Sequence, residues 1–410
     1  MKKTLFIILL IISLFTLSCK DKITSPLNNP IGITVNPNGT TPLSAVYTRE
    51  TVNTAPITVT VKGLYGEPDI IHTYPAGYGR EFEIHGMFAE SMNTIEVNDG
   101  GRIITKNVYV GALQNGIQKK YDVSINNLPE EKYPNNPNLY FSVMNSSSSV
   151  SATLGISRSG FLRYFQIYNQ TKIVIENKRM VLYPTIDTRN PDTQKNVDLL
   201  GNTLIKYPTI PHHDSIKVNN NYIYLSYSDW GSQDRLVEIN SSGTKLKELN
   251  FGKLIQASLD LKTYPGDEAI FKQIAFSEDL DNIYNNNGQQ QVIDWFHANS
   301  LVYDSSTDIL YVSSRHRGVL AIDYSEFRLI WWMADETLAT EVPLYIPYNI
   351  HLKDLKSLDA YSVKGDGMND GPKNQHALFL LANGNLGMFD NQGDENTNPN
   401  GSRYVEYSIT

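Results

Sequence analysis

The chain is poor in cysteine and carries no excess of positive charge. Cys19 is the single cysteine among 410 residues, so no disulfide can form within one chain and stability must come from a packed core. With 40% hydrophobic residues the chain can bury one or two such cores. The formal net charge of -8 argues against a nucleic-acid partner, because phosphate backbones are bound by lysine and arginine. An anionic substrate would therefore need a locally positive pocket.

The amino end combines two lysines, an apolar run and small residues. The run Leu5 to Leu17 is shorter than the roughly 20 apolar residues that a membrane-spanning helix needs, and polar residues follow it. Its order of regions is that of an export signal, and Leu17-Ser18-Cys19 resembles a lipobox. We expect residues 1–18 to be a lipoprotein signal peptide and Cys19 to carry lipid. The protein would then be anchored in the cell envelope, facing the periplasm or the cell surface. The alternative is an ordinary cleaved signal in which the cysteine occurs by chance.

The segment that follows predicts a small β-sandwich. Residues 19–30 are polar and predict a tether. Ile57 to Val61 alternates isoleucine or valine with threonine, and Asp99-Gly100-Gly101 separates two β-rich stretches as a hairpin turn does. We place this domain at residues 31–128. The proline-rich stretch from Leu128 predicts a linker, and a long loop inside one domain is the alternative.

A looser pattern recurs along residues 129–410. A histidine is followed by a turn and then by a strand rich in tyrosine, leucine or valine; this happens at His213, His297 and His376. The histidines are roughly 80 residues apart, about twice the 40 to 50 residues of a propeller blade. Propeller blades place the starts of their inner strands near one axis, so the three histidines would share a pocket. The alternative is that each histidine only closes a turn.

Four separated motifs stand out along the chain. They are, in chain order, His212-His213-Asp214, Asp294-Trp295-Phe296-His297-Ala298-Asn299-Ser300, Ser313-Ser314-Arg315-His316 and Asn374-Gln375-His376-Ala377. In sequence and in order these motifs resemble those of the bacterial arylsulfate sulfotransferases, which use no nucleotide sulfate donor. The resemblance implies an all-β fold in which the sandwich is followed by a propeller catalytic domain, residues 129–410. Family propellers have six blades and continue beyond the position matching Thr410, so the resemblance implies an incomplete propeller in this sequence.

The resemblance also implies the roles of individual residues. His376 matches the nucleophile that carries a sulfuryl group, which implies ping-pong kinetics, and His297 matches the general acid and base. Arg315 would clamp the sulfuryl oxygens, since its forked, permanently charged guanidinium suits an SO₃ group. Asn299 would donate to the same ligand, because two residues along an extended segment place its side chain on the face of His297. A surface arginine at a strand end and an amide that caps a turn are the structural alternatives.

His212 and His213 both match a substrate-binding element, and we favour His213. A zinc site is the alternative use of three histidines. Arg315 in the same pocket would repel a cation, and few carboxylates accompany the histidines, so we expect neither a metal nor another cofactor. His316 has no role in the matched motifs, and we expect it to be structural or exposed.

The implied partners are an aryl sulfate donor and a phenolic acceptor. A membrane is a further expected partner, through the lipid on Cys19, and nucleic acid is excluded as above. Family members are often homodimers, although no residue here indicates an interface. A non-catalytic propeller lipoprotein that retains the pocket but not the turnover is the alternative function.

Overall fold

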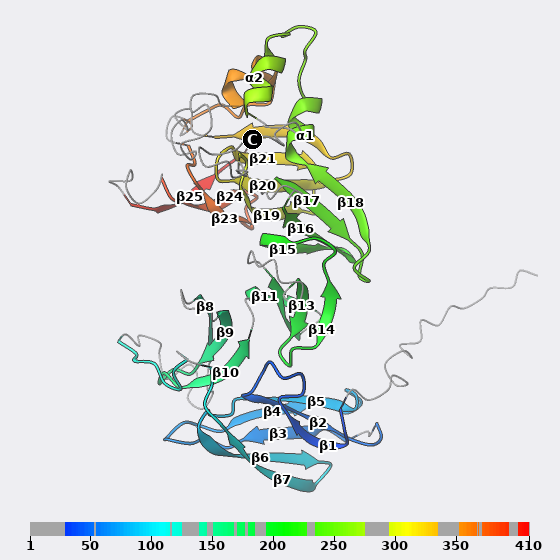
Figure 1. The fold of residues 1–410 in the computed structure, drawn as a ribbon, viewed down its shortest axis with the longest axis vertical. Helices are drawn as coiled ribbons and strands as arrows, with labels where there is room; N and C mark the ends of the chain where they lie inside the picture. Colours follow the sequence, from blue (N-terminus) through cyan, green and yellow to red (C-terminus); the bar gives the residue numbers. More distant parts are fainter. Residues whose placement is uncertain are drawn as a thin grey trace, which may run out of the picture. The chain divides into compact units, whose positions relative to one another are not determined.

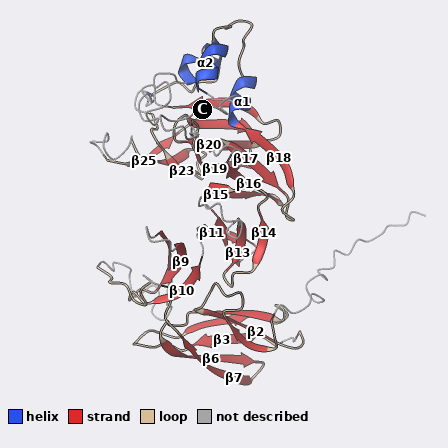
Figure 2. Cartoon of the chain, viewed as in Figure 1, coloured by secondary structure: helices blue, strands red, loops and turns tan. Residues whose placement is uncertain are grey.

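The computed structural model describes most of the chain after its amino end. The described residues are 29–52, 55–114, 117–124, 139–145, 151–167, 170–176, 179–184, 194–227, 234–274, 295–334, 352–366, 368, 371–392 and 401–409. The predicted signal peptide, Cys19 and most of the tether lie outside them, as does the predicted linker. Strands dominate both parts of the chain, and α-helix is confined among these residues to α1 (Phe251–Ala257) and α2 (Asp267–Ile274) (Figure 2). The all-β prediction is confirmed.

The chain divides into two compact units. The first holds the residues up to Tyr140 together with Gly155–Phe165, and the second holds Phe141–Leu154 and the residues from Gln166 onward. In the described part of the chain, no helix has the length and apolar character needed to cross a membrane.

The first unit is built on two antiparallel sheets (Figure 1). One has the strand order β1-β2-β5 and the other the order β4-β3-β6-β7. The strands are β1 (Gly32–Val35), β2 (Ser44–Thr48), β3 (Ile57–Val61), β4 (Ile70–Tyr74), β5 (Glu81–His85), β6 (Ser91–Asp99) and β7 (Arg102–Val110). The alternating sequence of β3 gives alternating burial, and the predicted hairpin is the β6–β7 pair, which turns at Gly100 and Gly101 with φ of 61° and 96°.

A buried arginine ties this unit together. Arg163 is fully buried; its Nη1 lies 3.1 Å from Glu67 Oε2, and its Nε donates to the Gly86 carbonyl at 2.8 Å. Its guanidinium also lies over the Phe88 ring, 3.9 Å from the centroid. Burial lowers the pKa of Arg163, and the charge of Glu67 opposes that shift. The Glu67 carboxylate therefore offsets part of the cost of burying the arginine charge.

Breaking this pair should destabilise the first unit. We expect Arg163→Met to lower the free energy of unfolding by about 3–5 kcal/mol, because it leaves the Glu67 carboxylate buried without its counter-charge. Urea unfolding of the full chain measures the change. The control is Lys62→Ala, whose ion pairs with Asp69 and Glu96 are more than a third exposed and should contribute at most about 1 kcal/mol. Equal effects of the two substitutions would contradict this account of Arg163.

The second unit consists of antiparallel sheets whose strands follow one another in chain order. Among the described residues, three of these sheets have four strands and one has three; a further three-stranded sheet has the order β10-β9-β8. The first four-stranded sheet consists of β11 (Gln170–Glu176), β12 (Arg179–Pro184), β13 (Lys195–Asp198) and β14 (Thr203–Lys206). The second consists of β15 (Pro211–Val218), β16 (Asn221–Ser226), β17 (Arg235–Ile239) and β18 (Lys245–Asn250). The third consists of β19 (Ala298–Asp304), β20 (Ile309–Ser314), β21 (Gly318–Asp323) and β22 (Arg328–Met333). The three-stranded sheets are β23 (His376–Leu380), β24 (Leu386–Asp390) and β25 (Arg403–Tyr407), and β8 (Tyr140–Asn145), β9 (Ser151–Ile156) and β10 (Leu162–Ile167). Two short 3₁₀ helices, Leu352–Asp354 and Lys356–Ala360, precede β23.

Successive sheets of this unit pack face to face. Tyr183 and Tyr224 belong to one buried cluster, which joins the β11–β14 sheet to the β15–β18 sheet. Leu225 and Leu320 belong to a second, which joins the β15–β18 and β19–β22 sheets, and a third cluster joins the β19–β22 and β23–β25 sheets. The strand β19 lies against both β15 and β23, so the first strands of three consecutive sheets are neighbours. This is the arrangement of propeller blades, and it brings the three histidine segments together.

Candidate functional site

The histidine segments share an unusual backbone at the start of their strands. The strands β15, β19 and β23 each contain a register shift against the next strand, close to His213, Asn299 and His376 respectively. His213 and His297 have left-handed backbone φ of 50° and 53°, which is uncommon for a residue with a side chain. Such conformations persist only where the surrounding structure enforces them, and they concentrate at functional sites.

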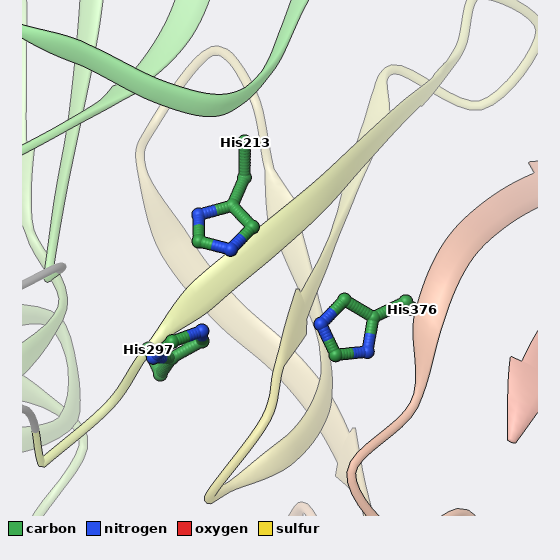
Figure 3. A group of neighbouring side chains, drawn as sticks. All are labelled: His213, His297 and His376. Atoms are coloured by element: carbon green, nitrogen blue, oxygen red, sulfur yellow. The ribbon is translucent and has the colours of Figure 1, made fainter. Parts of the chain in front are cut away.

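Three imidazoles meet at this point. The ring centroid of His213 lies 4.9 Å from that of His297 and 6.3 Å from that of His376. One nitrogen from each ring lies within 4.8 Å of the other two, and all three side chains are half-buried. Figure 3 shows the rings turned toward one shared space from three separate segments. The structure thus brings together the three histidines whose spacing predicted a common pocket.

The His376 ring is held by its Nδ1 atom. This nitrogen lies 3.0 Å from the Asn374 carbonyl and 3.1 Å from Asn391 Nδ2. In the tautomer that carries the proton on Nδ1, the ring donates to the Asn374 carbonyl. The Asn391 amide also donates to this carbonyl at 2.7 Å, so it helps to fix the segment beside the ring. In that tautomer the lone pair is on Nε2, on the side of the ring that faces His213 and His297 in Figure 3.

The surroundings of His376 favour its neutral form. Burial lowers the pKa of His376 below its ordinary value, and the positive charges of His297 and Arg315 lower it further. The hydrogen bond to Asn374 raises the pKa and opposes these effects. The neutral imidazole is therefore the favoured form of His376 at neutral pH.

The structure separates His212 from His213. Only His213 belongs to the group of three nitrogens, whereas His212 is buried with its ring edge against Tyr227, 4.8 Å between centroids. The Nδ1 atoms of the two histidines lie 3.1 Å apart, within hydrogen-bonding distance, so the buried His212 ring helps to orient the ring of His213.

Arg315 lies beside the histidines, as the motif predicted. It directly follows β20, and its backbone N–H donates to the His297 carbonyl at 2.9 Å. Its charge acts on His376, since it lowers that pKa. The side chain is only partly buried and can meet an anion. A guanidinium and three imidazoles form a site suited to a small tetrahedral anion.

The geometry of Asn299 differs from the extended segment that the sequence suggested. The left-handed φ of His297 and the register shift between Ala298 and Ser300 break the alternation on which the shared face depended. Asn299 is buried, and its Nδ2 donates to the Gln375 carbonyl at 2.8 Å. One of its two N–H groups therefore ties β19 to the segment that carries His376.

Three residues of the site were missed by sequence reasoning. The buried His316 ring lies 5.5 Å from that of His297, so of the two expectations, structural or exposed, the structure fits the first. Arg317 is buried with its guanidinium 5.9 Å from the Trp295 ring centroid, and burial lowers its pKa to about 10. The Gln375 amide donates to backbone carbonyls of two strands of the neighbouring sheet, Ser314 of β20 and Gly318 of β21. The three consecutive basic residues Arg315, His316 and Arg317 were the sequence signal that could have pointed to His316 and Arg317.

The three histidine nitrogens are spaced closely enough to be tested as metal ligands. The fit is poor, because the positive charge of Arg315 acts on the same pocket and would repel a cation. That the site uses no metal stays a prediction.

Two family models match the chain. The model described as Arylsulfotransferase (ASST) matches residues 129–410, and the one described as Arylsulfotransferase Ig-like domain matches residues 32–108. No curated protein matches the chain.

Solved structures show only weak likeness. A structural genomics protein of unknown function from Bacteroides thetaiotaomicron VPI-5482 is 9% identical, with a TM-score of 0.32 over 89% of this chain and 82% of that one. BamB from Moraxella catarrhalis is 10% identical, with a TM-score of 0.26 over 74% and 70%. The computationally designed Ika8 protein is 9% identical, with a TM-score of 0.29 over 81% and 78%.

Proposed function

The chain belongs to the arylsulfotransferase family, and from this premise we propose that it transfers a sulfuryl group through a covalent intermediate on His376. Membership indicates a sulfotransferase that acts on an aryl sulfate donor and a phenolic acceptor. The observation that supports the intermediate is the set of three imidazoles beside Arg315, in which the Asn374 carbonyl offers an acceptor for a proton on His376 Nδ1. The remaining nitrogen, Nε2, is the nucleophile.

In the first half-reaction the donor loses its phenol. The Nε2 lone pair of His376 attacks sulfur while the bond from sulfur to the aryl oxygen breaks, and His297 gives a proton to the departing oxygen. Arg315 and His213 donate to the peripheral sulfuryl oxygens, where negative charge is concentrated in a loose transition state. The sulfated imidazole ring becomes cationic, and the hydrogen bond from Nδ1 to the Asn374 carbonyl stabilises that charge.

The second half-reaction reverses these steps with a new phenol. His297, now neutral, removes the proton of the acceptor hydroxyl, and the phenolate oxygen attacks sulfur. The bond from sulfur to Nε2 breaks, which returns His376 to its neutral state and leaves His297 protonated for the next donor. Donor and acceptor thus use the same atoms in turn, and the kinetics are ping-pong.

An exchange assay tests this function. Purified protein is mixed with an aryl sulfate and a second phenol, without any nucleotide. Formation of the new aryl sulfate, with parallel lines in double-reciprocal plots over both substrates, is the expected result. Folded protein that exchanges nothing would instead support the alternative, a binding lipoprotein without turnover.

The lowered pKa of His376 predicts a characteristic pH dependence. The neutral ring is the nucleophile, so transfer to His376 should be level around pH 7 and fall only as the pH drops through a value below the ordinary 6.5. Single-turnover rates should be measured with a donor whose phenol is acidic enough to leave without a proton from His297. The pH dependence of these rates then reports the titration of His376 alone. In Arg315→Gln the inflection should move to higher pH, because a nearby positive charge is lost. An inflection at or above the ordinary value in the wild type would contradict the assignment.

We also propose that the protein is held at a membrane in the cell envelope by lipid on Cys19. The proposal rests on Lys2 and Lys3, the apolar run to Leu17 and the lipobox-like Leu17-Ser18-Cys19. Cys19→Ser should move the protein from the membrane fraction to the soluble one, and an unchanged distribution would refute the anchor.

A further inference from the structure

The side chain of Gln375 forms hydrogen bonds to the neighbouring sheet beside the proposed nucleophile. It directly precedes His376 and is fully buried. Its amide nitrogen lies 2.8 Å from the Ser314 carbonyl, 3.0 Å from the Gly318 carbonyl and 3.1 Å from Ser313 Oγ. All three acceptors belong to the neighbouring sheet, so this one side chain links β23 to the β20–β21 hairpin.

The two carbonyls bracket the turn that carries the arginine clamp. Ser314 and Gly318 face each other as the last pair of the β20–β21 ladder, and Arg315 to Arg317 form the turn between them. The backbone there is tightly constrained, because Gly318 has a φ of +82° and a Cβ at that position would lie 2.1 Å from the Met333 carbonyl oxygen. Gln375 therefore closes the base of this turn from the side of the nucleophile.

The backbone of Gln375 is fixed as well. Its carbonyl accepts from Asn299 Nδ2 at 2.8 Å and from Ser313 Oγ at 3.2 Å. Two residues beyond His376, the Leu378 N–H donates to Ser300 Oγ at 2.8 Å. The short segment around His376 is thus held on both sides by polar groups of β19 and β20.

In the part of the chain that the structure describes, the side-chain amide of Gln375 forms hydrogen bonds through its N–H groups but not through its oxygen. Gln375 Oε1 is buried and accepts no hydrogen bond from any described residue. A buried acceptor without a partner is unfavourable, so a purely structural position would be filled more stably by an apolar side chain of the same length. What the amide supplies at this position is the pair of bonds to the arginine turn.

From this arrangement we infer that Gln375 is a positioning residue that sets the separation between the His376 nucleophile and the Arg315 guanidinium. The inference rests on the proposed function of that site. Sulfuryl transfer requires sulfur to sit in line with Nε2 while its oxygens meet the guanidinium, and misplacement of about 1 Å can slow an enzymatic step about a hundredfold. Gln375 touches neither substrate nor sulfur in this account and acts only through the two residues that it holds.

A double-mutant cycle between Gln375 and Arg315 tests the inference. We expect Gln375→Met, which keeps the length but loses the amide, to slow single-turnover transfer by roughly ten- to a hundredfold, with little change in donor affinity. In the Arg315→Ala background the same substitution should slow transfer far less, because there is no clamp left to align. Equal slowing in both backgrounds, or no slowing in folded Gln375→Met, would overturn the inference.

Asn93 provides a matched control. It is a fully buried amide in the first unit that bonds Phe88 N–H at 2.7 Å, the Phe88 carbonyl at 2.9 Å and the Ser91 carbonyl at 3.1 Å. Asn93→Leu should lower stability without changing the single-turnover rate of the folded protein in either background. If Gln375→Met does not fold, Ser313→Ala takes its place in the cycle, because it removes the hydroxyl that contacts both the side chain and the carbonyl of Gln375.

A second measurement keeps this inference separate from the proposed function. NMR titration of His376 requires no turnover and senses the distance to the charge of Arg315. Gln375→Met should change the titration midpoint of His376 when Arg315 is present and leave it unchanged in Arg315→Ala. A wild type without exchange activity refutes the proposed function, whereas a midpoint indifferent to Gln375 refutes the positioning role.

Discussion

Replacement of His376 by asparagine is expected to abolish sulfuryl exchange and the covalent adduct. Asparagine is polar and smaller than histidine, so the segment held by Ser300 and Asn299 should keep its fold. It has no nitrogen lone pair comparable to that of neutral imidazole, and neither half-reaction can then proceed through the ring. We expect the exchange rate to fall by at least on the order of a thousandfold, as when other catalytic nucleophiles are removed.

His72→Asn is the control for this experiment. His72 lies on β4 in the first unit and is exposed, so its loss should leave exchange unchanged. If His376→Asn retained a substantial part of the wild-type rate, another residue would have to carry the sulfuryl group. In that event His213 or His297, whose rings share the pocket, would be substituted next.

Arg315→Ala is expected to slow adduct formation by on the order of a hundredfold or more while the protein stays folded. In the proposed reaction the guanidinium meets the charge on the sulfuryl oxygens, and loss of one preorganised donor of this kind has such an effect in other transfer enzymes. Arg315→Lys keeps the charge but loses the forked donors, so its rate should fall between those of the wild type and the alanine variant. Single-turnover release of phenol measures all three rates.

The control for the arginine is Arg328→Ala. Arg328 is two-thirds exposed and pairs with Asp323 at 3.3 Å on the same sheet, so its loss removes an equal charge away from the pocket. Its single-turnover rate should match the wild type. An Arg315→Ala rate close to that of Arg328→Ala would show that the guanidinium is not part of the transition-state site.

Much of the fold follows from local sequence patterns. Alternation of apolar residues with threonine predicted β3 within its observed bounds, and the paired glycines predicted the β6–β7 hairpin. The recurrence of histidine, turn and strand predicted that three distant histidines would meet, because equivalent positions in successive blades lie near one axis. These features depend on residues close in sequence or on a repeat, and both are visible without coordinates.

The details of the site depend on contacts that no local pattern encodes. The left-handed backbone at His213 is set by packing, and the sequence did not reveal that it turns His213 toward the pocket while His212 is buried. The same kind of backbone at His297 removed the expected shared face with Asn299. The bonds of Gln375 reach a strand some 60 residues earlier in the chain, so its role could emerge only from the folded structure.

The central claim is that His376 itself carries the sulfuryl group between donor and acceptor. The most direct measurement mixes the protein with an aryl sulfate in the absence of acceptor, quenches the reaction at alkaline pH and maps the peptides by mass spectrometry. We expect a burst of one phenol per chain and an acid-labile sulfuryl group on the peptide that contains His376, which an added phenol then removes. Phenol release without an adduct, or an adduct on a different residue, would contradict the account.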